Sequence, residues 1–256
     1  MSAVASRGYE PMRLNILIPV YNEERRLELG VRKAAGFLEA EAPGCCKITI
    51  VDNASTDRTG DIAHRLVCEV PHVEYLFVAT KGVGAAIREG VRANDCPLVG
   101  YMDVDLSTDV SHLVEVLDIF ENSSETDMVN GSRWNEASNT SGRKWYRNIT
   151  SHGLRFVLRA FLGMKATDAI CGFKFFRKSA ADRLVLMADP SENGWFFVIE
   201  MLLRAERSDM VVRELPVRWR DDYDSTVEVV KVTKNYLHHI RRLRKVFKEE
   251  ARTSGK

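Results

Sequence analysis

The sequence predicts an α/β fold with a mostly parallel central sheet covered by helices on both faces. Three observations support this prediction. Short apolar runs of strand length alternate with helical patterns along the first half of the chain. These runs are apolar at nearly every position, which is typical of strands buried on both faces. Polar clusters directly follow several of them, at the sheet edge where ligands bind in such folds.

The first half contains four expected strands with helices between them. The strands are expected at 14–20, 47–51, 73–78 and 98–102, and the helices at 27–38, 57–68 and 82–94. Asp57 is expected to cap the second helix. The carboxyl ends of the four strands should lie along one crevice, because neighbouring parallel strands end at the same edge.

The second half is less regular. It predicts strands at 128–131, 173–177 and 211–219, a polar loop at 135–143, and helices at 145–162, 195–207 and 226–249. Pro216 places its strand at an edge of the sheet, because proline has no N–H for a central ladder. No composition change marks a linker. We therefore expect a disordered segment at 1–13, one domain at 14–225, and a basic helix and tail at 226–256.

Composition narrows the class of protein. A chain of 256 residues with 45% hydrophobic residues can bury one large core. The net charge of +1 does not indicate a nucleic-acid partner. Five cysteines without a C-x-x-C pair disfavour a disulfide framework or a zinc site and favour a reducing compartment. No apolar stretch approaches a membrane span, so we expect a cytoplasmic protein whose membrane contact, if any, is peripheral.

The strongest site signal is Asp103-Val104-Asp105, at the end of the fourth strand. Residues i and i+2 of an extended segment project to the same side, so both carboxylates can face one cation. Such ligands suit Mg²⁺ or Mn²⁺, which also bind substrate phosphates. The alternative is a solvated loop that follows a strand.

Two weaker signals lie at the same predicted edge. Asp52 and Asn53 can hydrogen-bond a base or a ribose, or they can simply end a strand and form a turn. Lys81 and Gly82 open a helix, where backbone N–H groups and an ammonium can approach a phosphate. Neither a G-x-G-x-x-G motif after the first strand nor a P-loop is present, which disfavours dinucleotide oxidoreductases and P-loop enzymes.

A set of motifs occurs in a characteristic order along the chain. They are PVYNEE (19–24), VDNASTD (51–57), KGVGAAIREG (81–90), DVDLS (103–107), GSR (131–133) and DAICGFKFFRK (168–178). The pattern resembles glycosyltransferase family 2, and within it the polyprenyl- or dolichyl-phosphate mannosyl- and glucosyltransferases. The resemblance covers nearly the whole chain, from about residue 15 to about residue 236.

The resemblance implies a GT-A fold, a nucleotide-sugar donor and inversion at the anomeric carbon. The residues that it assigns to the donor are Pro19, Tyr21, Glu23, Asp52, Asn53, Lys81 and Gly82. It assigns the metal on the diphosphate to Asp103 and Asp105, phosphate contacts to Arg133 and Arg147, and the acceptor side to the segment that Asp168 opens. For Arg147 the alternative is the solvated face of a basic helix.

The chain departs from the family pattern in three ways. Asn53 stands where the family often has a second acid, which leaves the base preference open. Ser107 would be a weak third metal ligand. Many relatives carry C-terminal transmembrane helices, and this sequence shows none. Nothing in the sequence indicates an oligomeric state.

The expected reaction is direct displacement at the anomeric carbon, with a lipid phosphate as the leading acceptor. A phosphate acceptor is already ionised and needs no base. A hydroxyl acceptor would need one, and Asp168 is the preferred candidate over Glu200, whose alternative is a buried, paired carboxylate. The competing hypotheses are a soluble transferase that acts on a carbohydrate hydroxyl, a non-catalytic protein that binds nucleotide sugars, and a nucleotidyltransferase, whose usual glycine- and arginine-rich loop is missing.

The terminal helix also has two interpretations. Its apolar side chains alternate with lysine, arginine and histidine from residue 231 onward. Such a helix can lie on an anionic membrane surface. It can equally dock on the domain and leave a basic face in solvent.

Overall fold

The structure is a computed structural model that describes residues 12–141, 145–220 and 229–254. Its helices are α1 (Leu27–Glu41), α2 (Thr59–Glu69), α3 (Val83–Ala93), α4 (His112–Asn122), α5 (Trp145–Leu162), α6 (Lys178–Met187), α7 (Phe196–Arg207) and α8 (Val229–Ser254). Its strands are β1 (Leu14–Val20), β2 (Cys46–Asp52), β3 (Val73–Phe77), β4 (Leu98–Met102), β5 (Thr126–Ser132), β6 (Asn139–Ser141), β7 (Phe173–Arg177), β8 (Val211–Pro216) and β9 (Arg218–Arg220).

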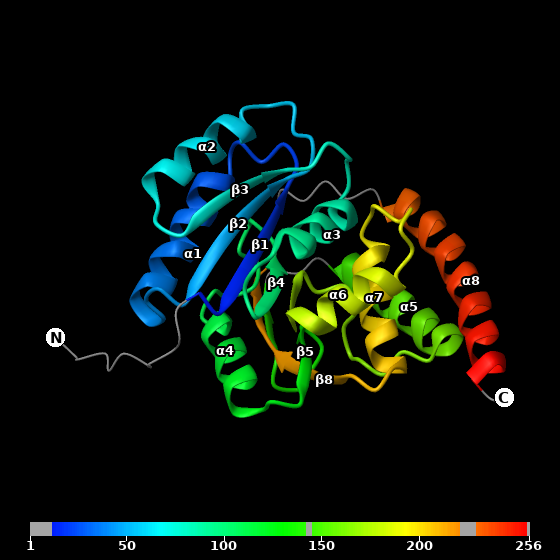
Figure 1. Cartoon of the computed structure of the whole chain (residues 1–256). Coiled ribbons are helices and arrows are strands. Elements are labelled where there is room, and N and C mark those ends of the chain that lie inside the picture. The colour runs from blue at the N-terminus through cyan, green and yellow to red at the C-terminus, as the bar shows by residue number, and fades with distance from the viewer. Residues whose placement is uncertain (1–11, 142–144, 221–228, 255–256) are drawn as a thin grey trace.

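Seven of the strands form one sheet in the order β3-β2-β1-β4-β7-β5-β8 (Figure 1). The first four in this order are parallel, with Val20 of β1 opposite Asp52 of β2. β7 is antiparallel to both of its neighbours, β4 and β5. The mostly parallel sheet is therefore confirmed, and a single antiparallel strand joins its two parallel parts.

Helices cover both faces because side chains alternate along each strand. On β1, Ile16 and Ile18 point into a core with α1, α2 and α4, and Leu17 points into a core with α3 and α5–α8. β7 repeats this alternation, with Phe175 in the first core and Phe176 in the second. Both cores are extensive, which fixes the sheet between two helical layers.

Several sequence predictions need correction. α4 and α6 were not expected, and β6 lies in the segment predicted to be a polar loop. The strand predicted at 211–219 is divided after Pro216: β8 pairs with β5 at the sheet edge, and β9 pairs with β6 in a separate two-stranded sheet. The edge position predicted from Pro216 is confirmed.

The structure describes only some of the residues at the expected domain limits. Residues 1–11 and 221–228 lie outside the described residues, so the disordered segment and the boundary at 225 stay predictions. Met12 and Arg13, however, donate backbone hydrogen bonds to the carbonyl groups of Gly44 and Cys45, at 2.9 and 2.7 Å. The ordered domain thus begins before residue 14.

α8 packs on the domain through its apolar side chains. Tyr236, Ile240, Leu243 and Phe247 are buried in the core shared with α5 and α7. Docking was one of the two interpretations of the terminal helix, and the structure confirms it. Within the described residues, no helix combines the length and the apolar character that crossing a membrane requires.

Candidate functional site

The carboxyl ends of β1, β2 and β4 bring the predicted polar clusters to one edge of the sheet. Tyr21 follows β1, Asn53 follows β2 and Asp103 follows β4. Lys81, from the segment after β3, places its Nζ 3.7 Å from the centre of the Tyr21 ring. The predicted convergence of these clusters is therefore confirmed, and the site lies in the crevice that parallel strands provide.

Asn53 is buried and ties three segments together. Its Nδ2 donates to the carbonyl of Val20 at 2.9 Å, and its Oδ1 accepts from the backbone N–H of Gly82 at 2.9 Å. Its own N–H also donates to Val20, at 3.0 Å. The side-chain amide thus positions the ends of β1 and β2 and the start of α3, and it is occupied by protein partners.

Asp52 is also buried, with a partner for each oxygen. Its Oδ1 accepts from the N–H of Ser55 at 2.9 Å, and its Oδ2 accepts from the Tyr75 hydroxyl at 3.0 Å. Burial and the neighbouring Asp52 raise the pKa of Tyr75 to about 12, so this hydroxyl remains a donor. The arrangement fixes the turn that follows β2.

Glu23 lies on the other side of the crevice, half-buried like Pro19 and Tyr21. Its carboxylate accepts from the Arg26 guanidinium at 2.7 and 2.8 Å, and its backbone N–H donates to the Thr59 hydroxyl at 2.8 Å. The predicted cap is not formed, because the N-cap residue of α2 is Arg58 and it makes no side-chain cap; Asp57, one residue earlier, instead accepts from the N–H of Thr59 at 2.9 Å. These contacts join the first and second loops of the site.

The start of α3 differs from the expectation of free N–H groups. The N–H groups of Gly84 and Ala85 both donate to the carbonyl of Asn193, at 2.8 and 3.4 Å. A Cβ on Gly82, which has φ +131°, would lie 2.1 Å from the same oxygen. The glycines are therefore needed for the close approach of the loop before α7, and the charged group that this segment could offer to a phosphate is the Lys81 ammonium.

Arg88 of α3 holds that loop and was missed from the sequence. It is buried, and it donates to Asn193 Oδ1 at 3.0 Å and to the carbonyls of Asp189 and Glu192 at 3.1 and 2.8 Å. The available signal was an arginine on the buried side of a helix, three residues before the core residue Val91.

Asp103 and Asp105 sit in a tight turn after β4. The N–H of Leu106 donates to the Asp103 carbonyl at 3.2 Å, and the N–H of Ser107 donates to Asp105 Oδ1 at 2.9 Å. Burial, followed by the charge of Asp105, raises the pKa of Asp103 to about 7. A buried acid whose ionisation is disfavoured by burial and by a neighbouring carboxylate is a suitable ligand for a cation.

Further observations support the fit of a divalent metal. Among the described residues, no lysine or arginine forms an ion pair with either carboxylate. The described residues contain no group of three or more histidine, cysteine or acidic side chains that could hold a metal ion, so an ion bound here would have two protein ligands among them. The two aspartates alone thus match a cation that completes its coordination with water and substrate phosphates.

Gly172 immediately precedes β7, and its backbone lies directly against the Asp103 carboxylate. A Cβ built on Gly172 would lie 2.0 Å from Asp103 Oδ2 and 2.6 Å from Oδ1. Any side chain at this position would therefore displace the carboxylate. Gly172 lies within the motif at 168–178, but the sequence alone indicates no role for it.

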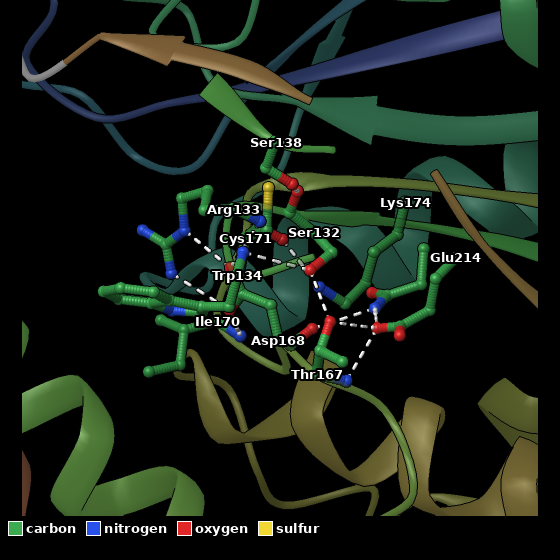
Figure 2. Close-up of polar contacts among 11 residues, drawn as sticks. Ser132, Arg133, Trp134, Ser138, Thr167, Asp168, Ile170, Cys171, Lys174 and Glu214 are labelled. Atoms are coloured by element: carbon green, nitrogen blue, oxygen red, sulfur yellow. Dashed lines mark hydrogen bonds and ion pairs between the residues drawn. The ribbon is translucent and has the colours of Figure 1, made fainter. Parts of the chain in front are cut away.

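Asp168 and Arg133 form a buried ion pair (Figure 2). Arg133 donates from Nε to Oδ2 at 2.7 Å and from Nη2 to Oδ1 at 3.0 Å. The Asp168 carboxylate also accepts from the N–H groups of Arg133, Ile170 and Cys171. Although burial opposes it, the Arg133 charge holds the pKa of Asp168 well below its usual range.

This pair changes the roles that were expected. A carboxylate with a depressed pKa and five donors is a poor general base, so the geometry disfavours Asp168 as the base that activates a hydroxyl. Arg133 is oriented by Asp168, and the central carbon of its guanidinium lies 5.4 Å from the centre of the Trp219 ring. Asp168 is thus a residue that positions Arg133 and the loop before β7.

A second buried group fixes the same loop. Lys174 of β7 is fully buried and donates to the Cys171 carbonyl at 2.6 Å (Figure 2). Asn130 donates to the Asp168 carbonyl at 2.8 Å, and Glu214 accepts from the N–H and the hydroxyl of Thr167 at 2.7 and 2.9 Å. These polar residues on three strands were missed, because their sequence neighbours indicate only buried β-structure.

Two candidates remain, Glu200 and Arg147. Glu200 on α7 is fully buried and pairs with Arg204 at 2.9 Å and with Arg242 of α8. This agrees with the paired-carboxylate alternative. Arg147 belongs to the first turn of α5, where side chains lie outside the described residues, so its phosphate contact stays a prediction.

Comparisons with known proteins were made by sequence and by structure. The family model described as glycosyl transferase family 2 matches residues 15–185. The chain is 32% identical over 232 residues to glycosyltransferase AglD of Haloferax volcanii, which covers 90% of this chain but 36% of that protein. This chain therefore spans about a third of that relative.

A second relative is matched over most of its length. Identity to the dolichyl-phosphate beta-glucosyltransferase of Saccharomyces cerevisiae is 28% over 230 residues, covering 83% of this chain and 68% of that one. Among solved structures, glucosyl-3-phosphoglycerate synthase from Mycobacterium tuberculosis, in complex with Mn²⁺, UDP and glucosyl-3-phosphoglycerate, has a TM-score of 0.69 at 13% identity. That match covers 91% of this chain and 80% of the other, and it confirms the GT-A fold.

Proposed function

This chain belongs to glycosyl transferase family 2, and from that premise we propose that it moves a hexose from a UDP- or GDP-sugar to a polyprenyl phosphate, with inversion at the anomeric carbon. The observation that carries the proposal is the Asp103–Asp105 pair, which lies without a basic partner among the described residues and against Gly172. The acceptor class is supported by the yeast dolichyl-phosphate relative, which aligns over most of both chains.

The donor is proposed to lie across the ends of β1 and β2. Tyr21, Pro19 and Glu23 border the nucleoside on one side, and Asp52 and Asn53 form the floor of the crevice. Lys81 is exposed and held over the Tyr21 ring, so its ammonium can reach a phosphate from the side of Gly82. An ammonium on an aromatic face keeps its charge available to a second partner.

Asp103 and Asp105 are the residues that would hold Mg²⁺ or Mn²⁺. Solved structures of similar fold contain Mn²⁺ or Mg²⁺ together with UDP. A bound divalent ion would neutralise the charge that grows on the leaving diphosphate. The chain's own contribution is geometric: the turn after β4 and the Gly172 wall keep both carboxylates in one place before the donor arrives.

The ion pairs of Asp168 and Glu200 favour a phosphate acceptor over a hydroxyl acceptor. These are the two carboxylates that were considered as general bases, and both form buried ion pairs with arginine. A phosphate is largely ionised near neutral pH, with a second pKa of about 6, and attacks without a protein base. Arg133, oriented by Asp168, and Arg147 are proposed to face phosphate oxygens, for which a guanidinium is well shaped.

The proposal is tested by measuring nucleoside diphosphate release. Purified protein is incubated with Mn²⁺ or Mg²⁺ and a panel of UDP- and GDP-sugars, with and without a short-chain polyprenyl phosphate. Release should require the lipid phosphate, and Asp105→Asn should abolish it. Asp61→Asn, the same change on the exposed first turn of α2, is the matched control and should retain activity.

Other results would redirect the assignment. Release with a carbohydrate hydroxyl but not with the lipid phosphate would establish the soluble hydroxyl-acceptor alternative. Metal-dependent binding of the nucleotide sugar without turnover on any acceptor would support a non-catalytic binding protein. Loss of activity in Asp61→Asn as well would show that the Asp105 result is not specific to the site.

A further inference from the structure

One side of α8 carries a basic stripe. Leu237, Arg241, Arg244 and Lys248 are exposed and recur at spacings of four, three and four residues, so they share one side of the helix. The opposite side of α8 faces the domain, where His239 contacts Glu192 at 2.6 Å and Arg242 contacts Asp189 at 2.9 Å. The helix is thus anchored by one side and presents the other.

α5 lies beside this stripe and extends it with aromatic side chains. Phe156 and Phe161 are 71% and 46% exposed, so α5 presents two aromatic rings at the surface. The Arg244 guanidinium lies 5.1 Å from the centre of the Phe161 ring and joins the two helices. We call these exposed side chains of the two helices the α5–α8 face: Phe156, Phe161, Leu237, Arg241, Arg244 and Lys248.

Acidic side chains of the same helix are directed elsewhere. Glu250 pairs with Arg204 of α7 at 3.1 Å, on the anchored side of α8. Glu249 lies 3.9 Å from Lys245, outside the stripe. Among the described residues, no carboxylate forms an ion pair with Arg241, Arg244 or Lys248. The face therefore presents positive charge to its surroundings without internal compensation.

An anionic bilayer fits this combination of side chains. Phenylalanine rings enter the acyl boundary, and the guanidinium and ammonium groups around them meet lipid phosphates. A nucleic acid would be matched by basic residues without a need for exposed phenylalanine, and a protein groove would require a continuous apolar stripe. On α8 the apolar stripe is already buried against the domain, so the helix would lie on lipid by its basic side.

The face is continuous with the candidate active site. His152, one turn before Phe156 on α5, packs against Trp134, with ring centres 4.4 Å apart. Trp134 follows Arg133, the arginine held by Asp168. A hollow between α5 and the loop before β7 is lined by Trp134, Arg155, Leu158, Met164, Thr167, Asp168, Ala169 and Ile170. A lipid that leaves the bilayer at α5 would therefore meet the acceptor side of the site first.

We propose that the α5–α8 face docks the protein on an anionic bilayer, with its phenylalanines in the interface, so that the acceptor side of the site opens at the level of the lipid headgroups. This inference deepens the proposed function, since it identifies the surface through which a lipid phosphate would reach the site.

The test measures partition of the full chain onto vesicles of phosphatidylcholine with and without phosphatidylglycerol. Each basic residue near an anionic surface is worth about fivefold in partition. Arg241→Gln, Arg244→Gln and Lys248→Gln together should therefore weaken binding to the anionic vesicles about 100-fold. Phe156→Ser should weaken it further, including at high salt, because it removes the apolar part of the contact.

The matched control makes the same change of net charge on other helices. Lys33→Gln, Arg65→Gln and Arg92→Gln alter exposed residues of α1, α2 and α3 and should leave vesicle binding nearly unchanged. Equal losses in the two triple variants would overturn the proposal, because net charge alone would then explain binding. Unchanged binding in the α8 variant, or no preference of the wild type for anionic vesicles, would also overturn it.

Activity on a short-chain polyprenyl phosphate in detergent separates this inference from the proposed function. The α8 triple variant should retain that activity and lose activity on acceptor embedded in vesicles. If the wild type transfers nothing to the detergent-soluble acceptor but still binds anionic vesicles through this face, the proposed function fails and the docking surface stands. If transfer is intact but vesicle binding does not depend on the face, the docking surface fails and the function stands.

Discussion

Substitution of Gly172 by alanine tests whether activity depends on the position of the Asp103 carboxylate as well as on its presence. The change leaves both aspartates in place and adds a single methyl group beside one of them. Gly172 does not have a positive φ, so alanine fits the backbone and the added contact is purely steric. The nearest atoms to that methyl group all belong to the Asp103 carboxylate.

The size of the displacement follows from the distances. The new Cβ would lie 2.0 Å from Oδ2 and 2.4 Å from Cγ of Asp103, whereas real Cβ atoms are essentially never closer than 3.0 Å to a heavy atom. The carboxylate must therefore retreat by about 1 Å. A misplacement of about 1 Å in a catalytic group costs on the order of 100-fold in rate. We expect kcat/KM to fall by about that factor and the affinity for Mn²⁺ to fall with it.

The assay combines steady-state kinetics, calorimetric titration of Mn²⁺ and thermal unfolding. Gly36→Ala on α1 is the control, since a Cβ there meets nothing within 4 Å. It should leave activity unchanged and stabilise the helix by about 1 kcal/mol. Gly172→Ala should change the melting temperature little, because the displaced group is the end of a side chain. Any loss of stability should disappear when Asp103→Ala is added, since that change removes the clash.

Two results would refute the reasoning. Full activity with unchanged Mn²⁺ affinity in Gly172→Ala would show that the observed position of the carboxylate is not the functional one. A loss of stability that persists in the double variant would show that the methyl group disturbs the backbone and not Asp103. A loss of activity at wild-type stability, absent in Gly36→Ala, is the expected outcome.

The other predictions concern pH and buried arginines. The pKa of Asp103 is raised to about 7, and a metal ligand must be deprotonated. The affinity for Mn²⁺ should therefore fall up to tenfold per pH unit below pH 7 and become constant above it. Calorimetric titrations from pH 5.5 to 8.5 that show no change of affinity with pH would contradict this. Asp168→Asn should cost about 3–5 kcal/mol of unfolding free energy by leaving Arg133 unpaired, as measured with urea. The pKa of Asp168 is depressed in the folded state, so this difference should be complete above the ordinary carboxyl pKa of 3.8 and shrink as the pH falls below it; a difference independent of pH down to 3 would count against the pair. Arg88→Ala should cost about 3 kcal/mol and weaken donor binding, whereas Arg92→Ala, exposed on the same helix, should do neither; equal effects would argue against a role for the loop contacts.

The regular half of the fold was predictable because local pattern and burial coincide there. β1, β2, β3 and β4 are short apolar runs, and each was expected within a few residues of its observed bounds. α4 was not predicted, although its buried side chains Leu113, Val116, Leu117 and Phe120 recur at helical spacing. β6 and β9 are three-residue strands that pair with each other, and Trp219 of β9 also bridges Thr108; segments this short have no hydrophobic period by which a sequence could predict them.

The part of the site that is proposed to hold the donor was predictable for the same reason. In a parallel sheet the residue that follows each strand is placed at the crevice by topology alone, so Tyr21, Asn53 and Asp103 needed no tertiary information. Their individual roles did need it. Asn53 could bond a ligand or a neighbouring loop, and only the fold shows that Val20 and Gly82 occupy its amide.

The part of the site that is proposed to face the acceptor depends on a feature that no local pattern predicts. This feature is the antiparallel insertion of β7 between β4 and β5. That insertion runs β7 away from the site edge, so its first residues, not its last, lie beside Asp103, and Gly172 becomes the wall of the acid pair. It also places Asp168, just before the strand, opposite Arg133, just after β5, and converts an expected base into the partner of an expected phosphate ligand. A parallel β7 would carry the same segment to the opposite edge of the sheet. The identity of the residues was visible in the sequence, but the direction of this one strand decides which chemistry each of them can perform.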